Sequence, residues 1–314
     1  MLNSKYWKVI FPFQLLVIII YLIDKERFLV WGQIDLTIFQ IINAPFQAHS
    51  IRIFLVGGLI YLGELLGYSE IITFNFFVTI LLLLNLRILY QIFKSYSSNK
   101  LFLFIILISS ILIPFFQNGR GIITSFGLSL LFYSLVIMPK KVTNHFKIII
   151  NIFFSFLFLN VSSGAFLASV ISFFFFFLFL NNKDNYLYKK RKIYSITLLT
   201  IASPISIIYL TKNIKYFDGS VIKMLNHGAG QVFNYLDFKI LFPLLIILSI
   251  LIIGIIIVFQ KSKYLTDFYP FVVASFIGLL FGYSSFFTFV YINIIFTTLI
   301  FQILTNSKTR VVKL

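Results

Sequence analysis

Long runs of apolar residues, separated by short polar segments, make up most of the chain. A helix needs about 20 residues to cross the hydrocarbon core of a bilayer, which is about 30 Å thick. Many of the runs approach that length, and the segments between them carry most of the lysines and arginines. The pattern therefore predicts an all-α, polytopic integral membrane protein. The clear candidate spans are Trp7–Ile23, Ile53–Tyr68, Ile71–Phe93, Leu101–Phe116, Ile122–Met138, Ile193–Thr211 and Ile240–Gln260.

Two further apolar runs, Ile148–Leu180 and Phe271–Leu304, are too long for one crossing. Each would extend about 50 Å as a continuous helix at about 1.5 Å per residue. Small polar residues lie near the middle of each run, so we predict two short helices joined by a tight turn in each. Such turns exist at membrane depth only where protein or a wet cavity satisfies the backbone. The residues of the two turns are Ser162, Ser163 and Gly164, and Gly282, Ser284 and Ser285.

With about 20 residues per span, the chain has about 11 or 12 spans, depending on whether residues 28–43 form one of them. This segment either crosses the membrane or lies on the outer surface. Asp35, near its middle, argues against crossing, because a buried aspartate costs about 2.5–3.5 kcal/mol on the translocon scale.

The composition supports a membrane protein and excludes several other classes. Hydrophobic residues make up 60% of the chain and charged residues 11%, whereas a soluble domain has about 25% charged residues. We therefore predict one transmembrane domain over residues 1–314. Cysteine is absent and the three histidines are far apart, and no phosphate-binding loop or zinc-protease motif occurs, so we expect no metal and no cofactor.

The basic residues predict the orientation of the chain. The net charge is +17, but the lysines and arginines are scattered between apolar runs, which indicates topology signals rather than a nucleic-acid surface. Residues 181–192, 139–147 and 306–314 are rich in them and are expected in the cytoplasm. The segment Gln117–Gly121 and the two serine-bearing turns then emerge on the outer face, and residues 212–239 form an extracytoplasmic, periplasmic segment.

Arg120 is the strongest candidate for chemistry. It lies between two predicted spans and is flanked by Gly119 and Gly121, which allow close approach of the backbone. A guanidinium binds phosphate oxygens in a bidentate manner. We therefore predict that Arg120 binds a lipid-diphosphate head group, with Asn118, Gly119 and Gly121 around it as substrate-binding residues. The alternative is an arginine that caps a hairpin at the interface.

Other polar residues of the predicted outer face are candidates for acid–base chemistry or sugar binding. The imidazole of His227 can remove a proton from a sugar hydroxyl, although an ordinary surface histidine explains it equally well. Asp35 is a candidate general base or sugar ligand, or alternatively a helix-start residue. The predicted substrate-binding residues are Ser162, Ser163, Asp218 and Asp237.

The order of these features resembles the EpsG-like and Wzy-type O-antigen or exopolysaccharide polymerases. Gly32, Asp35 and Phe39 are similar to a family pattern Gly-x-Asp-x-x-x-aromatic, with Gly and Asp one residue further apart, and YLGELLGYSEIITF resembles L-x-x-L-G-x-S. The family's arginine at the head of a span is matched by GRGIITSFGLSLLFYSL at Arg120. NVSSGAF keeps the polar break but lacks the family's histidine, and FGYSSFFTFVYINI lacks its closing arginine.

The resemblance implies a GT-C-like glycosyltransferase of the bacterial inner (plasma) membrane. It would act without metal on the outer face, moving a growing glycan from undecaprenyl diphosphate onto another lipid-linked repeat unit. Arg120 would stabilise the leaving group, and Asp35 or His227 would deprotonate the acceptor. The expected partners are undecaprenyl-diphosphate-linked oligosaccharide, membrane lipids and a chain-length regulator protein, with no nucleic acid. A transporter or flippase of lipid-linked oligosaccharides is the alternative, and a membrane acyltransferase is a third class.

Overall fold

The computed structural model describes residues 4–28, 53–96, 99–112, 119–141, 145–179, 186–224, 226–227 and 277. These residues form helices and turns and contain no strand. For the described part of the chain, the all-α prediction is confirmed. The chain divides into two units, Met1–Phe166 (unit 1) and Leu167–Leu314 (unit 2), and the prediction of one domain stays a prediction.

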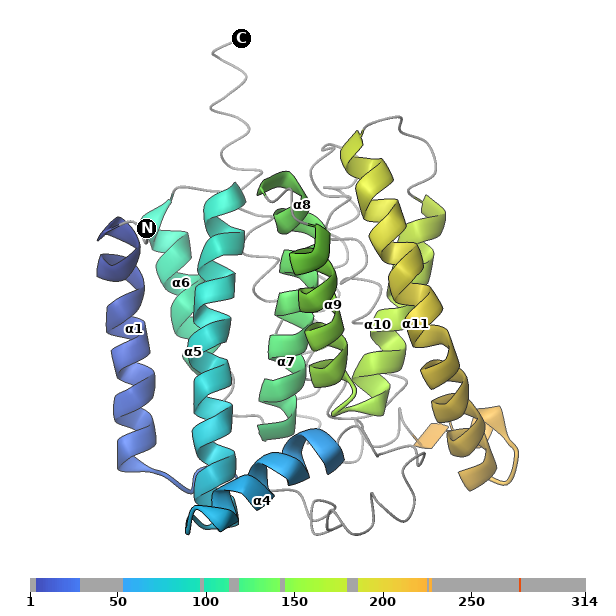
Figure 1. Cartoon of the computed structure of the whole chain (residues 1–314), viewed down its shortest axis with the longest axis horizontal. Helices are drawn as coiled ribbons and strands as arrows, with labels where there is room; N and C mark the ends of the chain where they lie inside the picture. The colour runs from blue at the N-terminus through green and yellow to red at the C-terminus, as the bar shows by residue number, and fades with distance from the viewer. Residues whose placement is uncertain are drawn as a thin grey trace. The chain divides into compact units, whose positions relative to one another are not determined.

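Unit 1 is built from helices that run side by side (Figure 1). The central pair is α7 and α9, and α7 also packs on α5, which in turn contacts α1, α4 and α6. Three described stretches are long and apolar enough to cross a membrane: Glu70–Ser95, Gly119–Ile137 and, in unit 2, Lys192–Lys212. The elements of unit 1 are α1 (Ser4–Ile23), the π-helical segment η1 (Ile53–Gly57), α4 (Gly58–Leu65), α5 (Glu70–Tyr96), α6 (Lys100–Leu112), α7 (Gly119–Phe132), the π-helical segment η3 (Tyr133–Ile137), α8 (Met138–Lys141), α9 (His145–Leu159) and the start of α10 (Ser163–Phe179).

The central helix α7 owes its position to two glycines. A side chain at Gly127 would lie 3.0 Å from the backbone nitrogen of Leu159 and 3.1 Å from the carbonyl oxygen of Ser155, so the backbones of α7 and α9 nearly touch there. A side chain at Gly119 would overlap the ring of Phe74 on α5. Small residues at helix contacts allow such close packing, which membrane proteins use widely.

The predicted break in the run Ile148–Leu180 is confirmed. Helix α9 ends at Leu159 and α10 begins at Ser163. The backbone N–H groups of Asn160 and Ser162 donate to the carbonyls of Phe156 (2.9 Å) and Leu159 (3.0 Å). The hydroxyl of Ser162 accepts a long hydrogen bond from the N–H of Ala165 (3.5 Å), as an N-cap does. The second predicted break, in Phe271–Leu304, lies outside the described residues.

The described helix within the predicted span Ile53–Tyr68 is shorter than a bilayer core is thick. The helical residues Ile53–Leu65 extend about 20 Å at 1.5 Å per residue. The helix ends in a Schellman motif, in which the N–H of Tyr68 donates to the carbonyl of Gly63 (3.0 Å) and the N–H of Gly67 to that of Glu64 (2.9 Å). Gly67 has the positive φ of 82° that this ending requires. Figure 1 shows α4 lying across the Glu70 end of α5.

Charges in the described part of unit 1 separate between the two ends of the helices. One end contains the start of α1, the end of α5, the start of α6, α8 and the start of α9 (Figure 1). It carries lysines and, among the described residues, no acid: Lys5, Lys8, Lys94, Lys100, Lys140, Lys141 and Lys147. The opposite end carries every acidic residue of this part, together with Lys25, Arg27 and Arg120: Asp24, Glu26, Glu64 and Glu70.

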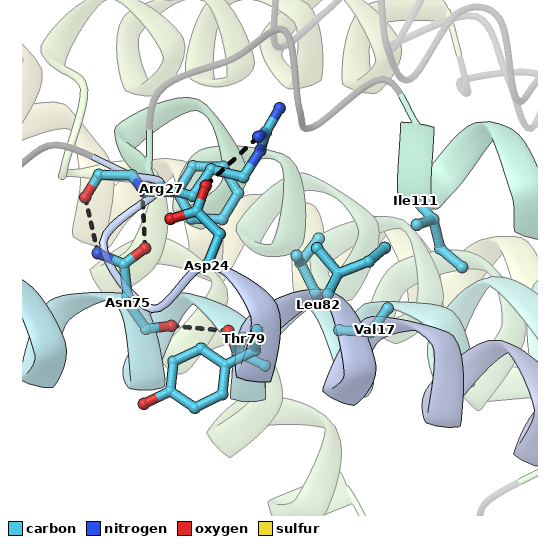
Figure 2. Close-up of a pocket in the computed structure, with 10 residues that line it drawn as sticks. Val17, Asp24, Arg27, Asn75, Thr79, Leu82 and Ile111 are labelled. Carbon is cyan, nitrogen blue, oxygen red and sulfur yellow. Dashed lines mark hydrogen bonds and ion pairs between the residues drawn. The ribbon is translucent and has the colours of Figure 1, made fainter.

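At the acidic end, the amide of Asn75 ties the end of α1 to α5. Its Oδ1 accepts a hydrogen bond from the N–H of Phe28 (2.8 Å), and its Nδ2 donates to the carbonyl of Phe28 (2.8 Å) and to that of Ile71 (2.8 Å). Asn75 is only 1% exposed. Figure 2 shows this amide turned toward the chain that leaves α1.

We expect Asn75→Ala to lower the free energy of unfolding by about 1.5–4.5 kcal/mol, because it removes three side-chain hydrogen bonds to the backbone of Phe28 and Ile71, at about 0.5–1.5 kcal/mol each. Thermal unfolding of the purified protein in detergent measures the change. Thr79→Val, one turn further along α5, is the matched control. It removes only a hydroxyl that bonds to the carbonyl of Asn75 (2.7 Å). Equal melting temperatures for the two variants would contradict the proposed tie.

Candidate functional site

Arg120 lies in the first turn of α7, at the acidic end of unit 1. Every other residue of α7 is buried, whereas the Arg120 side chain is half-buried. Arg120 is also the only charged residue in the stretch Gly119–Ile137. The start of a helix carries a partial positive charge from its aligned peptide groups. An arginine there adds to that charge, so this end of α7 favours an anion.

The first turn of α7 is held from both sides. Gly119 lies against Phe74 and Val78 of α5. The hydroxyl of Thr124 donates to the carbonyls of Arg120 (3.1 Å) and Gly121 (3.0 Å). The sequence predicted Gly119 and Gly121 as substrate-binding residues. The described contacts of Gly119 give it a packing role that does not require a substrate.

The turn between α9 and α10 lies on the same side of α7 as Arg120. Arg120 precedes Gly127 by two helical turns, so both lie on one face of α7, and the face at Gly127 contacts α9. Because α9 ends at Leu159, level with Gly127, Arg120 lies beyond the end of α9, about 10 Å further along the axis of α7. The two signals that the sequence predicted independently, Arg120 and the serine-bearing turn, therefore lie at the same end of the α7–α9 pair.

Within this turn, Ser162 is buried and acts as the cap of α10, and Ser163 is half-buried as the first residue of that helix. Asn160 is also buried. Its Nδ2 donates to the carbonyl of Phe156 (2.8 Å), while its Oδ1 has no hydrogen-bond partner among the described residues. The described contacts thus give Ser162 a structural role and leave an acceptor at Asn160, which the sequence did not single out.

A small cavity lies near the acidic end, between α1, α5 and α6 (Figure 2). Its lining includes the ion pair of Asp24 and Arg27 (3.6 Å), Asn75 and Thr79. The volume is about 20 Å³, which holds about one water molecule. A sugar or a diphosphate does not fit, so this cavity is not a substrate site.

In unit 2, two of the predicted outer residues, Asp218 and His227, lie in the short segment that follows α11. Helix α11 (Tyr186–Tyr216) ends there, and Asp218 and Gly219 have positive φ values of 54° and 76°. The ring of His227 lies 4.9 Å from the ring of Phe217 (centroid to centroid). The carboxylate of Asp218 pairs with Lys223 (3.2 Å), with side-chain exposures of 82% and 65%. An ion pair this exposed contributes little to stability, so both charges stay accessible to a ligand.

The remaining predicted site residues, Asn118, Asp35 and Asp237, lie outside the described residues. The structure also adds polar residues that the sequence reasoning missed. Ser125 and Ser129 are buried one turn apart on α7, and their hydroxyls have no hydrogen-bond partner in the part of the chain that the structure describes. Together with Gly121 they form a small-residue repeat with a spacing of four, a pattern readable in the sequence as a close helix contact.

Comparison with known proteins identifies no relative of this chain. No family model and no curated protein match the sequence, and no solved structure matches the fold.

Proposed function

We propose that this protein is a multi-pass protein of the bacterial plasma membrane. Three apolar helical stretches have the required length. The helices of unit 1 expose large apolar side chains along their length, for example Phe11, Ile19, Phe104 and Phe153, which are costly to leave in water but favourable against lipid. The positive-inside rule assigns the lysine-bearing end to the cytoplasm, so the acidic end with Arg120 faces outward.

On this outer face we propose a glycosyltransferase that joins lipid-diphosphate-linked oligosaccharide repeat units into a polysaccharide. The observation that carries the proposal is Arg120, the single charge of a buried apolar stretch of 19 residues, at the positive end of its helix. An arginine in that position can bind the negatively charged oxygens of a diphosphate leaving group. The resemblance of GRGIITSFGLSLLFYSL to the polymerases described above supports the same assignment.

The proposed step is a displacement at the anomeric carbon of the donor sugar. A hydroxyl of the acceptor unit forms the new carbon–oxygen bond, and the bond from the anomeric carbon to the diphosphate breaks. The hydroxyl proton passes to a base, for which Asp35 and His227 are the candidates. Arg120 stabilises the negative charge that builds up on undecaprenyl diphosphate. Asp218 and Asp237 are proposed to bind sugar hydroxyls.

Reconstitution in liposomes with a lipid-linked repeat unit tests this function. We expect products longer than one unit and one undecaprenyl diphosphate released for each linkage formed, also in the presence of EDTA. A flippase would instead move the unit between leaflets without changing its length. Transport without any longer product would overturn the polymerase assignment.

A further inference from the structure

Helix α4, with the preceding segment η1, is apolar on both of its faces. Val56, Ile60 and Gly63 follow a helical spacing of four and three and are buried. The opposite face exposes Phe54 (72%), Leu62 (57%) and Leu65 (65%). A helix that lies on a protein surface in water has a polar outer face. The outer face of α4 therefore needs an apolar neighbour.

The contact of α4 with α5 indicates its depth. A side chain at Gly63 would overlap Thr73, so the two helices touch at these residues. The stretch Glu70–Ser95 has 26 residues and extends about 39 Å at 1.5 Å per residue. It exceeds a core of about 30 Å by about one helical turn at each end. Thr73 lies about 4.5 Å from Glu70 along the axis, which is close to the edge of the hydrocarbon.

Neighbouring side chains point to the same boundary. Tyr61 of α4 and Tyr68, three residues after its end, are exposed, and tyrosine is enriched where lipid head groups meet acyl chains. Phe76, Ile80 and Leu84 form an exposed apolar stripe at intervals of four residues along α5. The lipid-facing stripe of α5 thus ends at the level where the apolar outer face of α4 begins.

We infer that α4 is an interfacial helix that lies in the outer leaflet without crossing it. Its outer face, formed by Phe54, Leu62 and Leu65, inserts among the acyl chains of bilayer lipids. Glu64, the only charged residue between Ile53 and Leu65, is exposed and reaches the head groups. The inference rests on the membrane location proposed above and is independent of the polymerase chemistry.

Site-directed spin labelling tests the inference. The sequence has no cysteine, so single substitutions Phe54→Cys, Leu62→Cys and Leu65→Cys give unique labelling sites on exposed positions. In liposomes of phosphatidylethanolamine and phosphatidylglycerol, accessibility to oxygen and to a water-soluble nickel complex reports the depth of each label. We expect all three labels at one shallow depth, about 5–10 Å below the head groups.

Phe76→Cys, Ile80→Cys and Leu84→Cys on α5 provide the matched control, with depth increasing by about 6 Å per step. Labels on α4 that contact the nickel complex as free water does would overturn the inference. So would a depth that increases steadily from Leu65 to Phe54, as in a crossing helix, or dipolar coupling between α4 labels of two chains, which would make a second copy the neighbour. If the α5 labels show no depth gradient, the membrane location itself is wrong and the inference falls with it.

Discussion

Arg120→Ala is expected to abolish long polysaccharide chains while the protein remains folded in the membrane. The substitution removes the only charge of α7 and with it the group that would balance the charge on the departing diphosphate. Loss of one such stabilising group lowers the turnover rate about 10²–10³-fold in well-studied enzymes. The rate of chain growth in liposomes, and the length of the products on a gel, measure the effect.

Two variants separate this role from a structural one. Arg120→Lys keeps the charge but loses the planar two-point contact, so we expect partial activity. Arg27→Ala, at the same end of unit 1, removes a partly exposed arginine paired with Asp24 and should leave chain growth unchanged. Normal chain length with Arg120→Ala would exclude the proposed role. A lower melting temperature together with a lower rate would instead indicate an arginine with a structural role at this end of unit 1.

Gly127→Leu should give a large loss of stability. The first side-chain atom would already lie 3.0 Å from the backbone nitrogen of Leu159 and 3.0 Å from the Cβ of Phe158. The further atoms of leucine have no space unless α7 and α9 move apart. Overpacking of this kind costs about 3 kcal/mol. Thermal unfolding in detergent is the measurement, and we expect polymer formation to fall as well because α7 carries Arg120.

Gly58→Leu is the matched control, since no atom lies within 4 Å of a side chain added at Gly58 of α4. It should unfold at the wild-type temperature or slightly above, because leucine favours a helix more than glycine does. Gly127→Ala should cost less than Gly127→Leu. If all three glycine variants melted together, the close contact between α7 and α9 would not be present in the folded protein.

The sequence predicted those parts of the fold that depend on local signals. The break after Leu159 was predictable because small polar residues interrupt an apolar run that is too long for one helix. The position of Arg120 at the head of a helix was predictable because it directly precedes an apolar run. The pairing of α7 with α9 was not predictable, since the contact at Gly127 depends on residues far apart in the chain.

The described helix Phe54–Leu65 is shorter than the span predicted over Ile53–Tyr68, and hydropathy alone does not reveal this for a physical reason. Hydropathy measures how apolar a run is, and an interfacial helix with two apolar faces has the same value as a short span. The local signals were present, because Gly67 ends the helix and the hydroxyl of Ser69 accepts a hydrogen bond from the N–H of Ile72 (3.3 Å) at the start of α5. These signals separate α4 from α5 at the correct place within Ile53–Phe93. They do not indicate whether α4 is oriented across the membrane or along its surface.

The early end of α9 makes the protein sensitive to the thickness of its membrane. At 15 residues, α9 extends about 22 Å, whereas the 26 residues of Glu70–Ser95 extend about 39 Å. A bilayer that suits the longer helix exceeds the shorter one, so lipids beside α9 must thin or the turn at Asn160 must descend into the acyl region. Lipids with longer tails would therefore strain the turn that follows α9.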